Sequence, residues 1–340
     1  MRHHHRLTIY NHKGGVGKTT LSVNIGAALA GQGLRGLLID SDPQCNLTSF
    51  FLPDAEVDEI LDKSEKPTGR TIWSALKPVA DGMGRVRRVK PYDLHVDNLF
   101  LVPGDIRLSG FEQQLGDSWA DSFKRRVAGL RATTALSDLV SDLVEEHAID
   151  VVMYDTGPNI GPLNRVIVLD SDHIVVPVAC DLFSVRALST LGQSLKTWIL
   201  DCRTVAALAP TNEEMLLGMP RFMGYIPQQF RVYGQEMAQT PSYYLRKVQK
   251  QIGSDVVNVL RKIDAALVPS SNIDPKLGQV KNFSTLVQEA QLEGTPLWDV
   301  SGGNAAHKTQ AKAAFEEIAS NIRIALQATK KPRRKLRPAE

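Results

Sequence analysis

A short apolar segment, a glycine-rich loop and a helical pattern follow one another at the start of this 340-residue chain. Residues 6–10 (RLTIY) predict a strand, and residues 19–33 (TTLSVNIGAALAGQG) predict a helix that glycines end. The loop between them lets successive backbone N–H groups point at phosphate oxygens, and the helix N-terminus adds partial positive charge. This order of elements constrains the chain to a fold in which a buried strand leads into a phosphate-binding loop.

The same alternation of apolar runs and helical patterns continues along the chain. Further strands are expected at residues 35–40, 98–102, 149–155, 173–178, 221–226 and 265–268. Because these runs are apolar throughout and are separated by helices, they predict an α/β fold with a mostly parallel central sheet and helices on both faces.

One large domain is expected over residues 1–329, and its last helix runs from about residue 307 to residue 329. Residues 53–92 are rich in proline, glycine and charge, which predicts a surface excursion from that domain. Residues 330–340 (KKPRRKLRPAE) cannot build a core, and we expect a basic, solvated tail there.

Composition excludes several classes of protein. The net charge of +3 is too small for a general polycation. Cys45, Cys180 and Cys202 form no CxxC pair, which favours buried thiols over a disulfide framework or a metal site. No apolar run approaches the length of about 20 residues that a membrane span needs, and no signal peptide is visible. A cytoplasmic protein is therefore the expectation.

The glycine loop carries the residues expected to bind a nucleotide. We expect Lys18 to reach the β- and γ-phosphates and the hydroxyl group of Thr19 to ligate Mg²⁺. The strict pattern G-x-x-x-x-G-K-[ST] is not met, because His12 occupies its first glycine position. The nucleotide-binding residues expected here are Gly14, Gly15, Val16, Gly17, Lys18, Thr19 and Thr20.

The stretch KGGVGKTT (13–20) resembles the loop of the deviant Walker A ATPases, the ParA/MinD family. In that family a second lysine crosses a dimer interface to contact the phosphates of the partner's ATP, and Lys13 matches its position. The resemblance implies a P-loop NTPase fold, ATP and Mg²⁺ as ligands, partner-stimulated hydrolysis, and a homodimer that forms in the ATP state. Lys13 and Lys18 are then both catalytic residues.

Two carboxylate segments extend the resemblance. The stretch DSDPQCN (40–46) is similar to the family's first switch, in which Asp42 would orient the attacking water, Asp40 would brace the metal shell, and Pro43 and Gln44 would move with them. An Asp-Pro turn that merely leaves a strand is the alternative reading of this segment.

The third segment is VVMYDTGPNIG (151–161), an apolar strand that ends in an aspartate. It resembles the Walker B strand and second switch, so Asp155 would hold Mg²⁺ directly or through water. Gly157 and Pro158 would form the switch, with Gly157 sensing the γ-phosphate through its backbone N–H group. Thr156 and Gly157 replace the commoner small-residue and proline pair, so this switch is expected to move differently. Farther along, GYIPQQF (224–230) lies where the family's loops surround adenine, which would place Pro227 near the base.

Such ATPases act on a surface, and the basic segments indicate which one. The tail carries one large aliphatic side chain, Leu336, so it lacks the apolar face that lipid insertion needs, and a membrane partner is not expected. A flexible basic tail suits nonspecific, salt-dependent binding to DNA. The DNA-binding candidates are Lys330, Lys331, Arg333, Arg334, Lys335 and Arg337 in the tail, and Arg85, Arg87, Arg88 and Lys90 in an inner cluster. Solvated, solubilising charge is the alternative for both.

The favoured function is a ParA-type ATPase that binds nonspecific DNA in its ATP state and segregates or positions a plasmid, chromosome region or other cargo, with an activating partner protein. A MinD-like membrane-positioning ATPase, a P-loop enzyme of small-molecule metabolism, and a ParA-like component of a specialised operon such as a defence operon remain alternatives. An iron–sulfur relative is excluded, because no pair of cysteines is placed to share a cluster across a dimer.

Overall fold

The computed structural model describes residues 4–210, 212–230, 232–233, 236–237, 239–283 and 285–328. The strands of its main sheet are β1 (His5–Ile9), β2 (Gly36–Asp40), β3 (Tyr92–Asp93), β4 (Leu99–Val102), β5 (Val151–Asp155), β6 (His173–Ala179), β7 (Arg221–Phe230) and β10 (Val280–Lys281). They lie in the order β10-β7-β6-β1-β5-β2-β4-β3, and β8 (Val232–Tyr233) and β9 (Glu236–Met237) form a separate two-stranded antiparallel sheet. Neighbours in the main sheet run parallel except β3 and β4, which confirms the predicted α/β fold.

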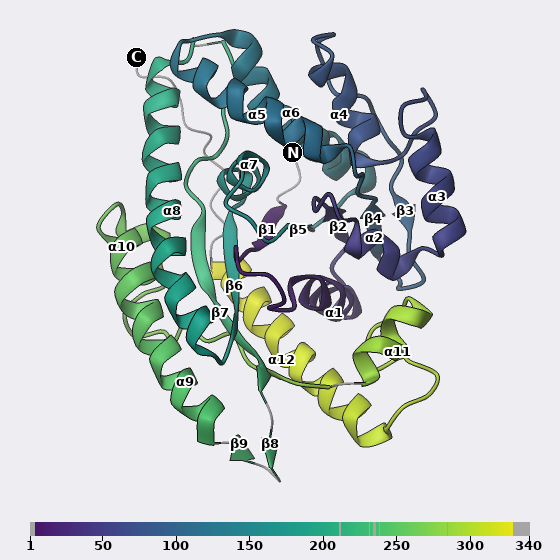
Figure 1. Ribbon diagram of the computed structural model, residues 1–340, viewed down its shortest axis with the longest axis vertical. Helices are drawn as coiled ribbons and strands as arrows, with labels where there is room; N and C mark the ends of the chain where they lie inside the picture. The colour runs from purple at the N-terminus through teal and green to yellow at the C-terminus, as the bar shows by residue number, and fades with distance from the viewer. Residues whose placement is uncertain are drawn as a thin grey trace.

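Helices cover both faces of this sheet (Figure 1). They are α1 (Lys18–Gly31), α2 (Asn46–Phe51), α3 (Asp54–Lys63), α4 (Ile72–Ala80), α5 (Leu108–Phe123), α6 (Val127–His147), α7 (Pro162–Asp170), α8 (Leu182–Leu208), α9 (Gln239–Gln251), α10 (Asn258–Arg261), α11 (Thr285–Glu293) and α12 (Ala305–Ala328), with a π-helical turn η1 (Ile252–Val257) and a 3₁₀ turn η2 (Ala265–Leu267). Among the helices of the described ranges, none is long and apolar enough to cross a membrane.

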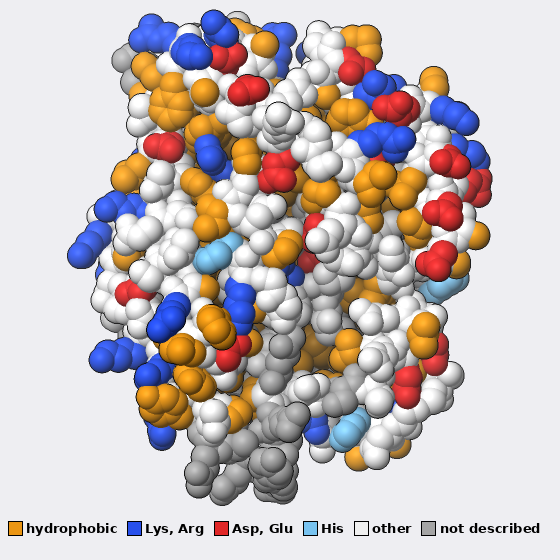
Figure 2. Space-filling model, viewed as in Figure 1, with side chains coloured by type: hydrophobic (Ala, Val, Ile, Leu, Met, Phe, Trp, Pro, Cys, Tyr) orange, Lys and Arg blue, Asp and Glu red, His pale blue; other side chains and the backbone are white. Residues whose placement is uncertain are grey.

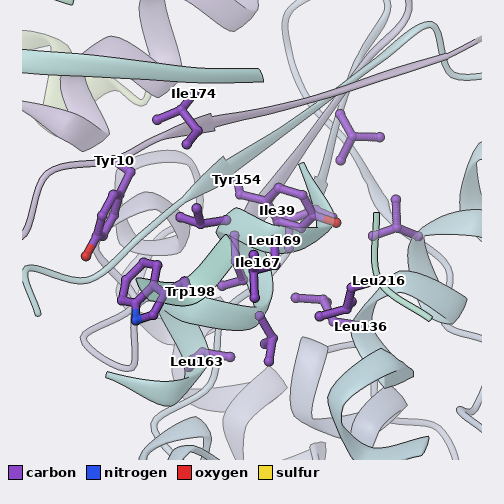
Figure 3. Close-up of a cluster of buried hydrophobic side chains, with 14 of the residues drawn as sticks. Tyr10, Ile39, Leu136, Tyr154, Leu163, Ile167, Leu169, Ile174, Trp198 and Leu216 are labelled. Atoms are coloured by element: carbon purple, nitrogen blue, oxygen red, sulfur yellow. The ribbon is translucent and has the colours of Figure 1, made fainter. Parts of the chain in front are cut away.

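Two apolar layers hold the helices to the sheet because side chains alternate along each strand. In β2, Leu37 and Ile39 belong to one buried cluster and Leu38 belongs to the other. The first cluster lies beneath α4 to α10, where Tyr154 and Trp198 are among its large members (Figure 3). The second is formed with α1, α2, α3, α11 and α12. The sheet is thus buried on both faces, as its uniformly apolar strands predict.

One predicted strand is wrong. Residues 265–268 begin with η2, because the side chain of Asp264 accepts a hydrogen bond from the backbone N–H of Ala266 at 2.9 Å and starts a tight turn. Of the residues in this turn, Leu267 alone is buried. The edge of the sheet beside β7 is taken by β10, which runs parallel to it.

The segment over residues 53–92 contains α3 and α4 and ends at the first residue of β3. The first turn of α4 is closed by a capping box, in which Thr71 accepts from the backbone N–H of Ser74 at 3.1 Å. Ile72, Ala75 and Leu76 are fully buried in the first cluster. This part of the expected excursion therefore contributes to the core.

The last described helix, α12, matches its prediction closely. Phe315, Ile318 and Ile322 form its buried stripe, and it lies beside α1 on the same face of the sheet (Figure 1). The basic tail that follows, from residue 330, lies outside the described residues.

Candidate functional site

The candidate site lies where β1, β5 and β2 end side by side. Because these strands are parallel and in register, Ile9 and Asp40 both pair with Asp155. The three segments that follow these strands therefore meet at one edge of the sheet, which is where open α/β sheets bind their ligands.

The loop after β1 has the backbone of a phosphate cradle. Gly15 and Gly17 adopt φ values of 69° and 76°, in the left-handed region that favours glycine, and Gly17 precedes the first residue of α1. Lys18 is 7% exposed, and its Nζ donates to the carbonyl oxygen of Asn11 at 3.1 Å. Burial lowers the pKa of Lys18, although Asp155 and Asp42 act in the opposite direction. The ammonium group is therefore held inside the loop, facing carboxylates.

Oxygen donors gather around Asp155, beside the first turn of α1. Thr19 Oγ1 donates to Asp155 Oδ2 at 2.7 Å, and Ser22 Oγ donates to Asp155 Oδ1 at 2.9 Å. Burial raises the pKa of Asp155 to about 6 despite these bonds. Hydroxyl and carboxylate oxygens are the ligands that Mg²⁺ prefers, and a cation there would offset the cost of the buried charge. The residues present fit the metal.

Asp40 is bonded to α2 rather than to the phosphate loop. It is fully buried, and its Oδ2 accepts from the backbone N–H of Thr48 at 2.8 Å and from Thr48 Oγ1 at 2.6 Å. Burial, followed by the charge of Asp155, raises the pKa of Asp40 to about 7. Its bonds tie the end of β2 to α2, a geometry compatible with bracing the metal shell.

The two switch segments lie against each other and against the loop. A Cβ placed on Gly157 would lie 3.3 Å from Asp42 Oδ1, and one placed on Gly14 would lie 3.7 Å from the Cβ of Pro158. Asp42 is 7% exposed and accepts from the backbone N–H of Gln44 at 3.0 Å, across the turn that contains Pro43. The sequence-predicted groups of both switches are thus brought to one place.

Asn164 is a contact of the second switch that sequence analysis did not identify. Its Nδ2 donates to the carbonyl oxygen of Gly157 at 3.0 Å and anchors the switch to the start of α7. An asparagine on a helix gave no signal of this role in the sequence.

The side chain of Lys13 points away from the phosphate loop, unlike that of Lys18. Its Nζ donates to Asp181 Oδ2 at 2.6 Å and to Ser184 Oγ at 2.9 Å, at the start of α8. Burial alone would raise the pKa of Asp181, but bonds from Lys13 and from the backbone N–H of Ser184 outweigh it and lower that pKa. The Lys13 side chain is 25% exposed. Within this chain its ammonium group is therefore held outside the loop.

Gln228 is a second residue that sequence analysis missed. It is 2% exposed in β7, and its Nε2 donates to the carbonyl oxygen of Val16 at 2.7 Å. Its side chain lies over Gly17, where a Cβ would come within 2.7 Å of Oε1. Residues 224–230 thus form a strand rather than the loop suggested by resemblance. Side chains alternate along a strand, so Gln228 rather than Pro227 faces the loop; the contact of Pro227 with adenine stays a prediction.

The described structure places only the inner cluster of the candidate DNA-binding residues. Those of the tail are outside the described residues. In the inner cluster, Arg85, Arg88 and Lys90 are exposed, whereas Arg87 is half-buried and donates to the carbonyl oxygen of Lys66 at 2.9 Å.

A family model described as an AAA domain matches residues 4–205, more than half of the chain. The chain belongs to this family, as a P-loop ATPase of the ParA/MinD type. It is 33% identical over 191 residues to the sporulation initiation inhibitor protein Soj of Bacillus subtilis, covering 56% of this chain and 64% of Soj. It is 28% identical over 193 residues to the chromosome partitioning protein ParA of Caulobacter vibrioides, covering 56% of this chain and 61% of that protein. The aligned region therefore spans less than two thirds of these relatives.

Solved structures extend the similarity of the fold to nearly the whole chain. Protein DIP2308 from Corynebacterium diphtheriae matches with a TM-score of 0.73 and 21% identity, over 96% of this chain and all of that one. A variant of Cyanothece McdA in complex with ATP matches with a TM-score of 0.60 and 17% identity, over 95% of this chain and 97% of that one. At these identities the comparison establishes the P-loop NTPase architecture.

Proposed function

We propose that this chain is a nucleotide-switched ATPase of the ParA type, which hydrolyses ATP with Mg²⁺, dimerises in its ATP state and then binds DNA nonspecifically. The observation that carries the proposal is that the two lysine side chains of one loop point in opposite directions. Lys18 points into the loop, toward Asp155 and Asp42, whereas Lys13 points out of it to Asp181. A single nucleotide site needs one of these ammonium groups for its phosphates.

Each residue of the site has a role in phosphoryl transfer. Residues 14–20 supply N–H donors and Lys18 binds the phosphates. Thr19 and Asp155 would hold Mg²⁺, which would supply charge neutralisation on the phosphate oxygens. Asp42 orients the attacking water beside the backbone N–H of Gly157. Since such a reaction needs positioning and charge neutralisation more than covalent chemistry, these groups are the contribution of one subunit to hydrolysis.

Dimerisation is the switch in this proposal. Lys13 reaches the partner's nucleotide only after its bond to Asp181 breaks, and the γ-phosphate of ATP supplies the competing attraction. Two exposed apolar side chains flank the region: Ile160 in the second switch and Phe183 beside Asp181 are 39% and 69% exposed. They provide apolar surface for a second copy to bury. An activating partner then speeds hydrolysis, and the chain releases the DNA.

DNA co-sedimentation at low and moderate salt tests the proposal, with no nucleotide, with ADP–Mg²⁺ and with ATP–Mg²⁺. The expected result is binding in the ATP state alone, weakened by salt. Lys18→Ala is the matched control and should remove the ATP dependence. Equal binding in all three states would refute the switch, and absence of binding would refute the DNA partner while leaving the ATPase assignment to be measured by phosphate release.

A further inference from the structure

A single face of α9 carries a row of cations. Arg246, Lys247 and Lys250 follow Tyr243 at the spacing i+3, i+4 and i+7, so all four project from one side of the helix. All four are exposed, whereas Val248 is buried on the opposite side. The row is therefore a solvent-facing stripe on a helix anchored by its other face.

The stripe continues beyond α9. The helix runs through η1 into α10, where Arg261 and the following Lys262 are also exposed. From Arg246 to Lys262 the distance is about 24 Å at a rise of about 1.5 Å per residue. We call Arg246, Lys247, Lys250, Arg261 and Lys262 the basic stripe.

The helix that carries the basic stripe has few acidic side chains that could neutralise it. Asp255 is the only acid between residues 239 and 262. It is half-buried and accepts hydrogen bonds from Gln251 and Ser254. Within residues 239–262 the five cations therefore meet one acid, which polar neighbours already engage; Asp264, two residues beyond Lys262, accepts a hydrogen bond from the backbone N–H of Ala266 at 2.9 Å.

The opposite edge of the molecule has the reverse charge. Figure 2 shows cations along the edge where Figure 1 draws α9 and α10, and acids at the far edge over α3. Five acids lie within α3, against a single lysine: Asp54, Glu56, Asp58, Glu59 and Asp62, with Lys63. A polyanion is attracted to the first edge and repelled by the second, so this asymmetry selects one docking face.

We infer that the basic stripe is a binding surface for the phosphate backbone of duplex DNA. This inference rests on the proposed function and locates its DNA surface within the described residues, where sequence analysis had placed it on the tail and on residues 85–90. A row of cations about 24 Å long spans about two thirds of a turn of duplex, so it can contact several successive phosphates. Serine, asparagine and glutamine between the cations add polar contacts and no base-reading motif, which fits nonspecific binding.

An anionic membrane is a poorer fit to this surface. Lipid insertion needs an apolar face, and among the described side chains of α9 the large exposed hydrophobic one is Tyr243. Lys247 Nζ lies 4.6 Å from the centre of its ring, so part of that ring is already covered by a cation. The inner cluster is also a weaker candidate for DNA, because Arg87 is bound to Lys66 O and faces the segment that follows acidic α3.

The test compares two variants that remove the same charge. R246Q/K247Q/K250Q neutralises part of the stripe, and R85Q/R88Q/K90Q neutralises the inner cluster; R246K/K247R/K250R keeps the charge of the stripe. DNA affinity is measured for the full chain with ATP–Mg²⁺ over a range of salt, together with ATP turnover and melting temperature. The first variant should lose DNA affinity at least about tenfold at 0.1 M salt, and its slope of log K against log salt should fall by about 3.

ATP turnover and melting temperature should stay at wild-type values in all three variants, and the charge-conserving variant should bind DNA normally. A stripe variant that binds DNA like the wild type, while the wild type binds in its ATP state, overturns the inference and leaves the proposed function standing. A wild type that binds no DNA in any state overturns the inference and the DNA-binding part of the proposed function. Binding of the wild type to phosphatidylglycerol vesicles but not to DNA would assign the stripe to a membrane and overturn the inference.

Discussion

Residues 4–205 and residues 212–328 build one sheet but differ in how their functional groups are arranged. In the first region the candidate catalytic groups follow the ends of β1, β2 and β5, so short motifs place them together. In the second region the side chain that reaches the phosphate loop, Gln228, lies within a strand, and the exposed cations are spread along a helix. Motifs thus describe the chemistry of the first region and miss the contributions of the second.

The match to the family model covers the first region and stops where that region ends. It ends at residue 205, before β7, α9 and α10. Changes in the first region should therefore abolish functions shared with relatives, whereas changes in the second should adjust the affinity of this chain for its ligands.

The largest effect is expected from Lys18→Ala in the phosphate loop. Loss of charge-assisted bonds to phosphates, at about 1.5–3 kcal/mol each, should weaken ATP binding by about 100-fold or more and abolish turnover. Titration with a fluorescent ATP analogue and phosphate release measure this. Normal ATP turnover by the Lys18→Ala variant would show that this loop is not the nucleotide site.

Lys13→Ala should separate binding from dimerisation. The variant should bind ATP within a few fold of the wild type, because Lys13 points away from its own loop. Its ATP-dependent dimer should weaken by about 10- to 100-fold through loss of a charge-assisted contact. Light scattering with a non-hydrolysable ATP analogue measures the dimer, and a normal dimer would contradict the role of Lys13 in trans.

Gln228→Leu tests whether a residue of the second region contributes to nucleotide binding by the phosphate loop in the first. The change leaves the buried carbonyl of Val16 without its donor, at a cost of about 1–3 kcal/mol, so the loop should bind ADP and ATP about tenfold more weakly. Isothermal titration with ADP checks this, with melting temperature as the measure of folding. A variant with lower melting temperature and unchanged nucleotide affinity would limit Gln228 to packing.

Asp181→Asn should have the smallest effect, and in the opposite direction. Asparagine keeps an oxygen for the backbone N–H of Ser184 but removes the charge that holds Lys13. Partly exposed ion pairs contribute about 0–1 kcal/mol, so the ATP-dependent dimer should strengthen by up to about fivefold. A weaker dimer would mean that Asp181 assists the interface instead of competing with it.

Sequence by itself determined the sheet, its covered faces and the groups at the ends of β1, β2 and β5. These follow from local properties: uniformly apolar runs must be buried on both faces, and parallel strands bring their carboxyl ends to one edge. The same local reasoning failed at residues 265–268, where a capping aspartate overrode a short apolar run.

Only the tertiary structure decided which groups meet across long distances in the chain. The bond between Gln228 and Val16 spans 212 positions, and that between Lys13 and Asp181 spans 168. The basic stripe likewise becomes apparent only when packing shows which side of α9 faces solvent. A sequence pattern records periodicity and strand ends, but the partner of a single polar side chain depends on the register and packing of elements that no local pattern specifies.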